Sequence, residues 1–108
     1  MPLPPGVRVV CDRVVPERIV SGEAVQVIAR IENDTADPVT VTATADMIGP
    51  AYPPDSPRAG EINELRLDSE TTVVGANSAE TFQTPPVTVD LRARPAGEYD
   101  VVVRGEIA

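Results

Sequence analysis

Residues 24–47 read AVQVIARIE-NDTADP-VTVTATADM, and this stretch decides the fold class. In its first part every second side chain is apolar: Val25, Val27, Ala29 and Ile31. The last part repeats the pattern with Val39, Val41, Ala43, Ala45 and Met47, which alternate with Thr40, Thr42, Thr44 and Asp46. A period of two predicts strands with one buried and one wet face. Asn, Asp and Pro predict the turn between them, so we expect a β-hairpin.

The alternation continues on both sides of this stretch. Residues 7–15 predict a first strand, with a β-bulge where Arg13 interrupts the apolar parity. Three short strands are expected at 61–67, 71–74 and 79–84, and a helical interpretation stays open for the first of them. Residues 49–60 contain four prolines and predict an irregular loop.

The composition supports an all-β fold. Val, Ile and Thr make up 32 of the 108 residues, and twelve Pro are scattered along the chain. β-Branched side chains fit a pleated sheet, and Pro leaves few windows for a helix. Seven or eight short strands separated by turn residues predict an antiparallel β-sandwich or barrel. The length fits one domain, which we place at residues 7–108 behind a Pro-rich arm at residues 1–6.

The end of the chain predicts a second hairpin, between residues 87–94 and 98–103. Pro95-Ala96-Gly97 suits a three-residue loop, with Pro in a type I turn and Gly in the left-handed region. The register joins opposite charges on the wet face and apolar side chains in the core. The expected pairs are Arg94 with Glu98, Arg92 with Asp100, Ala93 with Tyr99, Leu91 with Val101, and Val89 with Val103.

Three segments carry a family resemblance: residues 19–27 (IVSGEAVQV), 29–34 (ARIEND) and 95–101 (PAGEYDV). The last matches a Pro-x-Gly-x-Tyr-x-Val ending that is common in immunoglobulin-like sandwiches. From Glu17 to its end, the chain resembles such sandwiches of bacterial and archaeal surface proteins. Among them are the cell-adhesion-related domain found in bacteria and fibronectin type III-like modules. The resemblance implies an immunoglobulin-like antiparallel β-sandwich of seven to eight strands, without the Cys-Trp-Cys set of antibody domains.

Four residues are expected to be structural: Pro95, Gly97, Tyr99 and Cys11. Two interpretations of Tyr99 are open, a tyrosine corner whose hydroxyl bonds nearby backbone, or an ordinary inward aromatic residue. Cys11 lies among valines on the inward parity and is expected to be a small buried hydrophobe. A reactive thiol would need exposure and positive neighbours, of which Arg13 is one.

The composition argues against catalysis and nucleic-acid binding. The chain has no His, the usual proton shuttle near neutral pH, although a carboxylate pair among seventeen Asp and Glu is conceivable. Its nine basic residues, all Arg, leave a net charge of −8, which disfavours phosphate backbones. The apolar runs are too short for membrane insertion. We expect no enzyme activity and no cofactor.

An acidic turn is the one candidate for a metal. Glu32, Asn33, Asp34 and Asp37 offer the oxygen ligands that calcium prefers. Their spacing does not match a calcium-binding loop, and Asn and Asp are common turn residues in any case. We expect no metal site.

Two segments are candidates for binding a protein partner. The arm offers Leu3, Pro4 and Pro5, and the Pro-rich loop offers Tyr52, Pro53, Pro54 and Arg58. Such loops present a preformed segment to a partner, or serve only as stiff connections. We expect a non-catalytic structural module, a small subunit of a larger assembly such as a phage capsid decoration or tail protein. The alternative is a cell-surface adhesion or carbohydrate-associated module.

The expected partners are other protein subunits, including further copies of this chain, on a virion or cell surface. The number of strands bears on how they would bind. If Tyr99 opens the sixth strand of the sandwich, one strand is missing, and a neighbour could supply it by edge addition. A free edge beside residues 99–107 would support this hypothesis.

Overall fold

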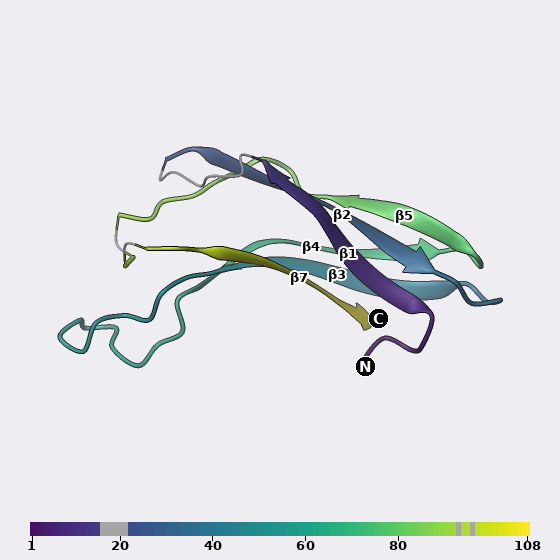
Figure 1. Cartoon of the computed structure of the whole chain (residues 1–108), viewed down its shortest axis with the longest axis horizontal. Coiled ribbons are helices and arrows are strands. Elements are labelled where there is room, and N and C mark those ends of the chain that lie inside the picture. The colour runs from purple at the N-terminus through teal and green to yellow at the C-terminus, as the bar shows by residue number, and fades with distance from the viewer. Residues whose placement is uncertain (16–21, 93, 96) are drawn as a thin grey trace.

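The computed structural model describes residues 1–15, 22–92, 94–95 and 97–108. Two antiparallel sheets face each other (Figure 1). The first contains β1 (Val7–Val15), β2 (Ala24–Asn33) and β5 (Ser78–Gln83), and the short β6 (Val87–Thr88) also pairs with β2. The second has the order β4 (Glu64–Val74), β3 (Val39–Ile48), β7 (Asp100–Ile107). Within the described residues the protein is therefore an all-β sandwich of seven strands, as predicted.

The core lies between β2 and β3. The predicted inward residues Val25, Val27, Ala29 and Ile31 are fully buried, as are Val41, Ala43 and Ala45 from the other sheet. Phe82 of β5 adds the largest buried side chain. Burying a Val, Ile or Phe side chain stabilises a fold by about 1.5–3 kcal/mol. The described residues include no helix that is long and apolar enough to cross a membrane.

The expected hairpin between β2 and β3 is wrong, because the two strands lie in different sheets. Buried Asn33 ends β2, and its side-chain amide donates to the carbonyls of Asp37 (2.8 Å) and Gly75 (3.1 Å). These bonds hold the turn against the β4–β5 connection while the chain crosses to the second sheet. Alternation of side chains is the same in a hairpin and in a crossover, so the pattern does not distinguish them.

The expected C-terminal hairpin is also wrong. Val87 pairs with Val25 of β2, whereas β7 pairs with β3. Val89 stays with the first sheet, since its N–H donates to Glu23 at 3.1 Å. The expected charge pairs are replaced by Arg92 with Asp90 (2.9 Å) and by Arg94 with the Asn63 side chain (2.8 Å). Ala93 of this predicted hairpin lies outside the described residues.

Bulges account for two further outcomes. The register of β1 shifts between Cys11 and Arg13, which confirms the bulge predicted there. The prediction of two short strands at residues 61–67 and 71–74 is wrong, because residues 64–74 form the single strand β4, with a register shift opposite Ala45 and Asp46. Bulges let a long edge strand bend without ending.

Candidate functional site

The N-terminal arm lies against β7 of its own chain. Ile107 N–H donates to the Met1 carbonyl at 2.9 Å, and Pro2 forms an isolated antiparallel bridge with Glu106. Leu3 is half-buried and packs on the core. Of the three predicted arm residues, Leu3 therefore serves the sandwich itself, whereas Pro4 and Pro5 are exposed.

Gly105 is the position in β7 that admits the arm. A Cβ there would come within 2.5 Å of Val9 Cγ2 and within 3.1 Å of Leu3 Cδ1. Side chains of β1 and of the arm thus converge on β7 where β7 has no side chain of its own. The backbone contacts of Met1 and Pro2 cover the C-terminal end of the β7 edge beside this packing.

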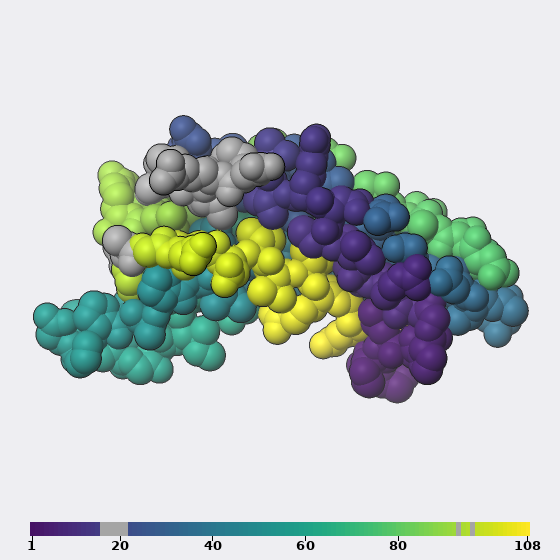
Figure 2. Space-filling model, viewed as in Figure 1, coloured from purple at the N-terminus to yellow at the C-terminus, as the bar shows by residue number. Residues whose placement is uncertain are grey.

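Within the described part of the chain, nothing pairs with the outer side of residues 100–104 of β7, which we call its open edge. Val101 and Val103 pack on the core but are only half-buried, whereas their counterparts on β2 and β3 are fully buried. Among the described residues, β3 is the one strand that pairs with residues 100–104. In Figure 2 the yellow surface of β7 is accordingly visible between the loop and β1.

The Pro-rich loop projects from one end of the sandwich (Figures 1 and 2). Two turns follow each other, with Ser56 N–H donating to the Pro53 carbonyl and Ala59 N–H donating to the Ser56 carbonyl, both at 3.0 Å. Pro53 and Pro54 are exposed. The loop is therefore ordered by its own hydrogen bonds, and it presents its prolines to solvent.

Arg58 covers Tyr52 inside this loop. The Arg58 guanidinium lies 4.6 Å from the centre of the Tyr52 ring, a cation–π contact, and its Nε donates to Glu61 at 2.6 Å. The Tyr52 side chain is buried, with 7% of the residue exposed, and its hydroxyl has no hydrogen-bond partner among the described residues. Of the predicted loop residues, Arg58 faces solvent and Tyr52 packs beneath it.

The base of the loop is joined to the segment before β7 by a polar cluster around Asn63. The buried Asn63 amide donates to the Pro50 carbonyl and to the Tyr99 hydroxyl, both at 3.0 Å. The Tyr99 hydroxyl in turn donates to the Pro95 carbonyl at 2.7 Å. This is the geometry of a tyrosine corner, one of the two interpretations considered for Tyr99. Gly97 (φ 142°) lies where a Cβ would come within 2.7 Å of Pro50.

Asp46 lies on the outer face of the second sheet, and its burial corrects the expectation of a wet side chain there. Only 1% of the side chain is exposed, because Arg66 (2.6 Å) and Arg104 both bond its carboxylate from above. Burial raises the pKa of the Asp46 carboxyl, but hydrogen bonds and positive charge from Arg104 and Arg66 outweigh it, so the net pKa is lowered. Asp46 thereby anchors Arg104 beside the open edge of β7.

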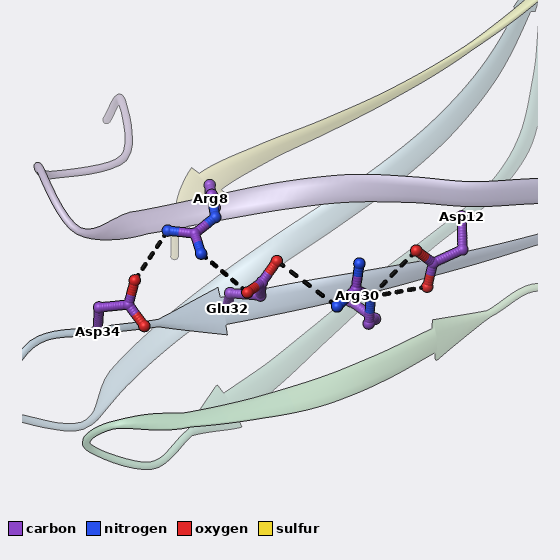
Figure 3. A network of polar contacts seen from close by, with 5 residues as sticks. All are labelled: Arg8, Asp12, Arg30, Glu32 and Asp34. Atoms are coloured by element: carbon purple, nitrogen blue, oxygen red, sulfur yellow. Dashed lines mark hydrogen bonds and ion pairs between the residues drawn. The ribbon is translucent and has the colours of Figure 1, made fainter.

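A row of alternating charges covers the outer face of β1 and β2 (Figure 3). Arg8 bonds Asp34 at 2.8 Å and Glu32 at 2.9 Å. Arg30 bonds Asp12 at 2.8 Å and lies 3.8 Å from Glu32. Both arginines are thus neutralised within the row, and this face offers a partner no free positive charge from them.

The polar side chains of the acidic turn bond other groups of the protein and do not converge on a common site. Glu32 and Asp34 bond Arg8, and the Asn33 amide bonds carbonyl groups. In the described parts of the chain, no three His, Cys, Asp or Glu side chains converge in a way that could hold a metal ion.

Cys11 is exposed, and the expectation that it is buried is wrong. It pairs with buried Ala29 and so faces inward, but it lies on the edge strand β1, where the second sheet does not cover it. Partial burial, and then the nearby Asp12 charge, raise the pKa of the thiol. Inward parity therefore does not ensure burial on an edge strand.

The structural roles of two residues, Asn63 and Asp46, are not indicated by the sequence pattern. Asn63 stands in a predicted short strand, and Asp46 occupies an outward position like the threonines before it. Their partners are 36 and 58 residues away along the chain, at Tyr99 and Arg104. Only the folded chain brings them together.

Comparison with known protein families, curated proteins and solved structures gives no match for this chain.

Proposed function

We propose that this protein is a non-catalytic structural module that binds other protein subunits within a larger assembly, such as a phage capsid decoration or tail structure. The observation that supports it best is the self-ordered Pro-rich loop. A loop held by its own hydrogen bonds and by the Asn63 cluster loses little conformational entropy when a partner binds. Its exposed Pro53 and Pro54 offer a preformed contact surface.

The immunoglobulin-like resemblance belongs to this proposal. Two antiparallel sheets and a tyrosine corner ahead of β7 are compatible with it. Sandwiches of this kind present end loops on a rigid body, which is how the Pro-rich loop is placed here. Fold alone does not identify a partner, so the proposal rests on the loop.

The adhesion or carbohydrate-associated alternative has less support. Sugar sites stack their ligands on exposed aromatic rings, but Tyr52 and Phe82 are 7% and 1% exposed. Tyr99 uses its hydroxyl to hold the loop base. No aromatic platform is therefore offered by these three side chains.

Loop variants test the proposal. The full chain is immobilised and exposed to lysate of its source organism, and captured proteins are quantified by mass spectrometry. We expect P53S/P54S to lose a protein that the parent captures. The matched control is P85S/P86S, which changes two other exposed prolines outside the loop. Equal capture by the parent and the loop variant would contradict the proposal.

A further inference from the structure

The direction of backbone groups along β7 defines what its open edge offers. Ala108 N–H donates toward β3, to Thr40 at 3.0 Å, whereas Ile107 N–H donates away from β3, to Met1 at 2.9 Å. Successive residues of a strand point their N–H and C=O groups to opposite sides. The backbone groups of the odd-numbered residues of β7 therefore point away from β3. Those of Val101 and Val103 have no backbone partner on that side among the described residues.

The five residues of this open edge are self-complementary in an antiparallel pairing. Asp100-Val101-Val102-Val103-Arg104 has an acid at one end, a base at the other and valines between. If two copies align about Val102, each Asp100 lies opposite Arg104 of the other copy, and each Val101 lies opposite Val103. Opposite charges and β-branched residues are favourable cross-strand pairs.

We propose that two copies of this protein join their β7 strands antiparallel about Val102, which merges the two β4-β3-β7 sheets into one. The register that pairs the opposite charges is also the one in which the backbone hydrogen bonds can form. Val101 and Val103 are opposite each other in this register, and both point their backbone groups to the edge, so they form hydrogen-bonded pairs. Each such pair exchanges two backbone bonds, and the twofold axis makes two pairs.

The two charged residues of the edge, Asp100 and Arg104, have groups available to form ion pairs in this register. Asp100 is exposed and has no ion pair or side-chain hydrogen bond in the described chain. Arg104 is held in place through Nη2 by Asp46 and lies 3.3 Å from Glu64. The described residues leave its Nε and Nη1 without a hydrogen-bond partner, so both can donate to a second carboxylate.

Two of the other three edge strands, β1 and β4, are less suited to pairing. β1 and β4 contain register shifts, and a bulge twists an edge away from a new strand. The arm already occupies β7 at Glu106. This limits the pairing to residues 100–104, and a short pairing of this kind predicts a weak dimer that depends on protein concentration.

Sedimentation equilibrium of the full chain from about 10 µM to about 1 mM tests the pairing, since short interfaces lie at the weak end of affinities. We expect a monomer–dimer equilibrium. V101P removes an edge-facing N–H but no bond to β3, so it should abolish the dimer while the circular dichroism spectrum is unchanged. D100R places like charges opposite each other and should weaken the dimer by about tenfold or more.

D55R is the matched control for D100R, because it changes the net charge equally at an exposed loop residue. It should dimerise like the parent. Hydrogen exchange adds a readout that needs no variant: protection of the Val101 and Val103 amides should rise with protein concentration. A monomer throughout this range, a dimer that survives V101P in folded form, or amide exchange at these two residues that does not vary with concentration would overturn the proposal.

Discussion

The backbone of Gly49 packs directly against the ring of Tyr99, so closely that a Cβ on Gly49 would come within 2.1 Å of Tyr99 Cε2. The contact joins the end of β3 to the residue that precedes β7. The Asn63 carbonyl also accepts the Gly49 N–H at 3.0 Å, so the backbone there has little freedom to retreat. The absence of a side chain at position 49 is thus part of the tyrosine corner.

G49A should destabilise the protein. The added methyl group displaces the Tyr99 ring and its hydroxyl from Pro95, and overpacking of this kind costs about 1–3 kcal/mol. Urea unfolding measures the free energy. G75A is the control, because its nearest contact would be an ordinary 3.6 Å from Ser78 Oγ. Equal stabilities of the two variants would refute the role of this contact.

Two Tyr-to-Phe substitutions should have different effects. Y99F removes the bond to Pro95 and leaves the Asn63 amide one acceptor short, which should cost about 1–2 kcal/mol. Y52F removes a buried hydroxyl that has no partner in the described structure, so stability should be unchanged or slightly higher. Thermal and urea unfolding of both variants provide the comparison. A larger loss for Y52F than for Y99F would contradict it.

Asp46 should make the free energy of unfolding depend on pH in the acid range. Its folded-state pKa is lowered, so the carboxylate contributes stability at pH values above its ordinary pKa of 3.8. This contribution is lost as the pH falls through the lower folded pKa. D46N should therefore be less stable than the parent at pH 7 by about 1–3 kcal/mol, and this difference in unfolding free energy should narrow as the pH falls below 3.8. D55N, at an exposed carboxyl in the loop, is the control. A gap that does not change with pH would exclude the charge as its cause.

The N-terminal arm, residues 1–6, should contribute to the stability of the sandwich. Leu3 packs on the core beside Gly105, so L3A should lower the unfolding free energy by about 1 kcal/mol, as expected for a half-buried side chain. It should also speed hydrogen exchange at Ile107. M1A is the control, because Met1 is 80% exposed and contributes its carbonyl rather than its side chain. If L3A and M1A are equally stable, the arm does not cover the core.

Cys11 should react with a maleimide in the native protein. The thiol is exposed, but its pKa is raised, so labelling should be slower than for free cysteine at pH 7 and should accelerate as the pH rises. Mass spectrometry over time measures the rate. Labelling that requires denaturant would mean that Cys11 is buried after all.

Much of the fold follows from side-chain periodicity. The alternation in residues 24–32 and 39–47 predicts β2 and β3 and the inward side chains of both strands. The break at Arg13 likewise predicts the β1 bulge, which the register shift beside Cys11 confirms. These features are local, because the backbone pleat alone sends successive side chains to opposite faces.

The neighbours of each strand were decided by tertiary structure. Both expected hairpins join strands that instead lie in different sheets, because a period of two assigns each side chain a face but does not assign the strand a partner. Tertiary structure also decided which side chains are buried. Cys11 has the inward parity and is exposed on an edge strand, whereas Asp46 has the outward parity and is buried beneath two arginines. For β2 and β3, the sequence by itself determined which residues form strands and which way their side chains face. Only packing decided which edges are covered, because covering an edge requires groups that are distant in the chain.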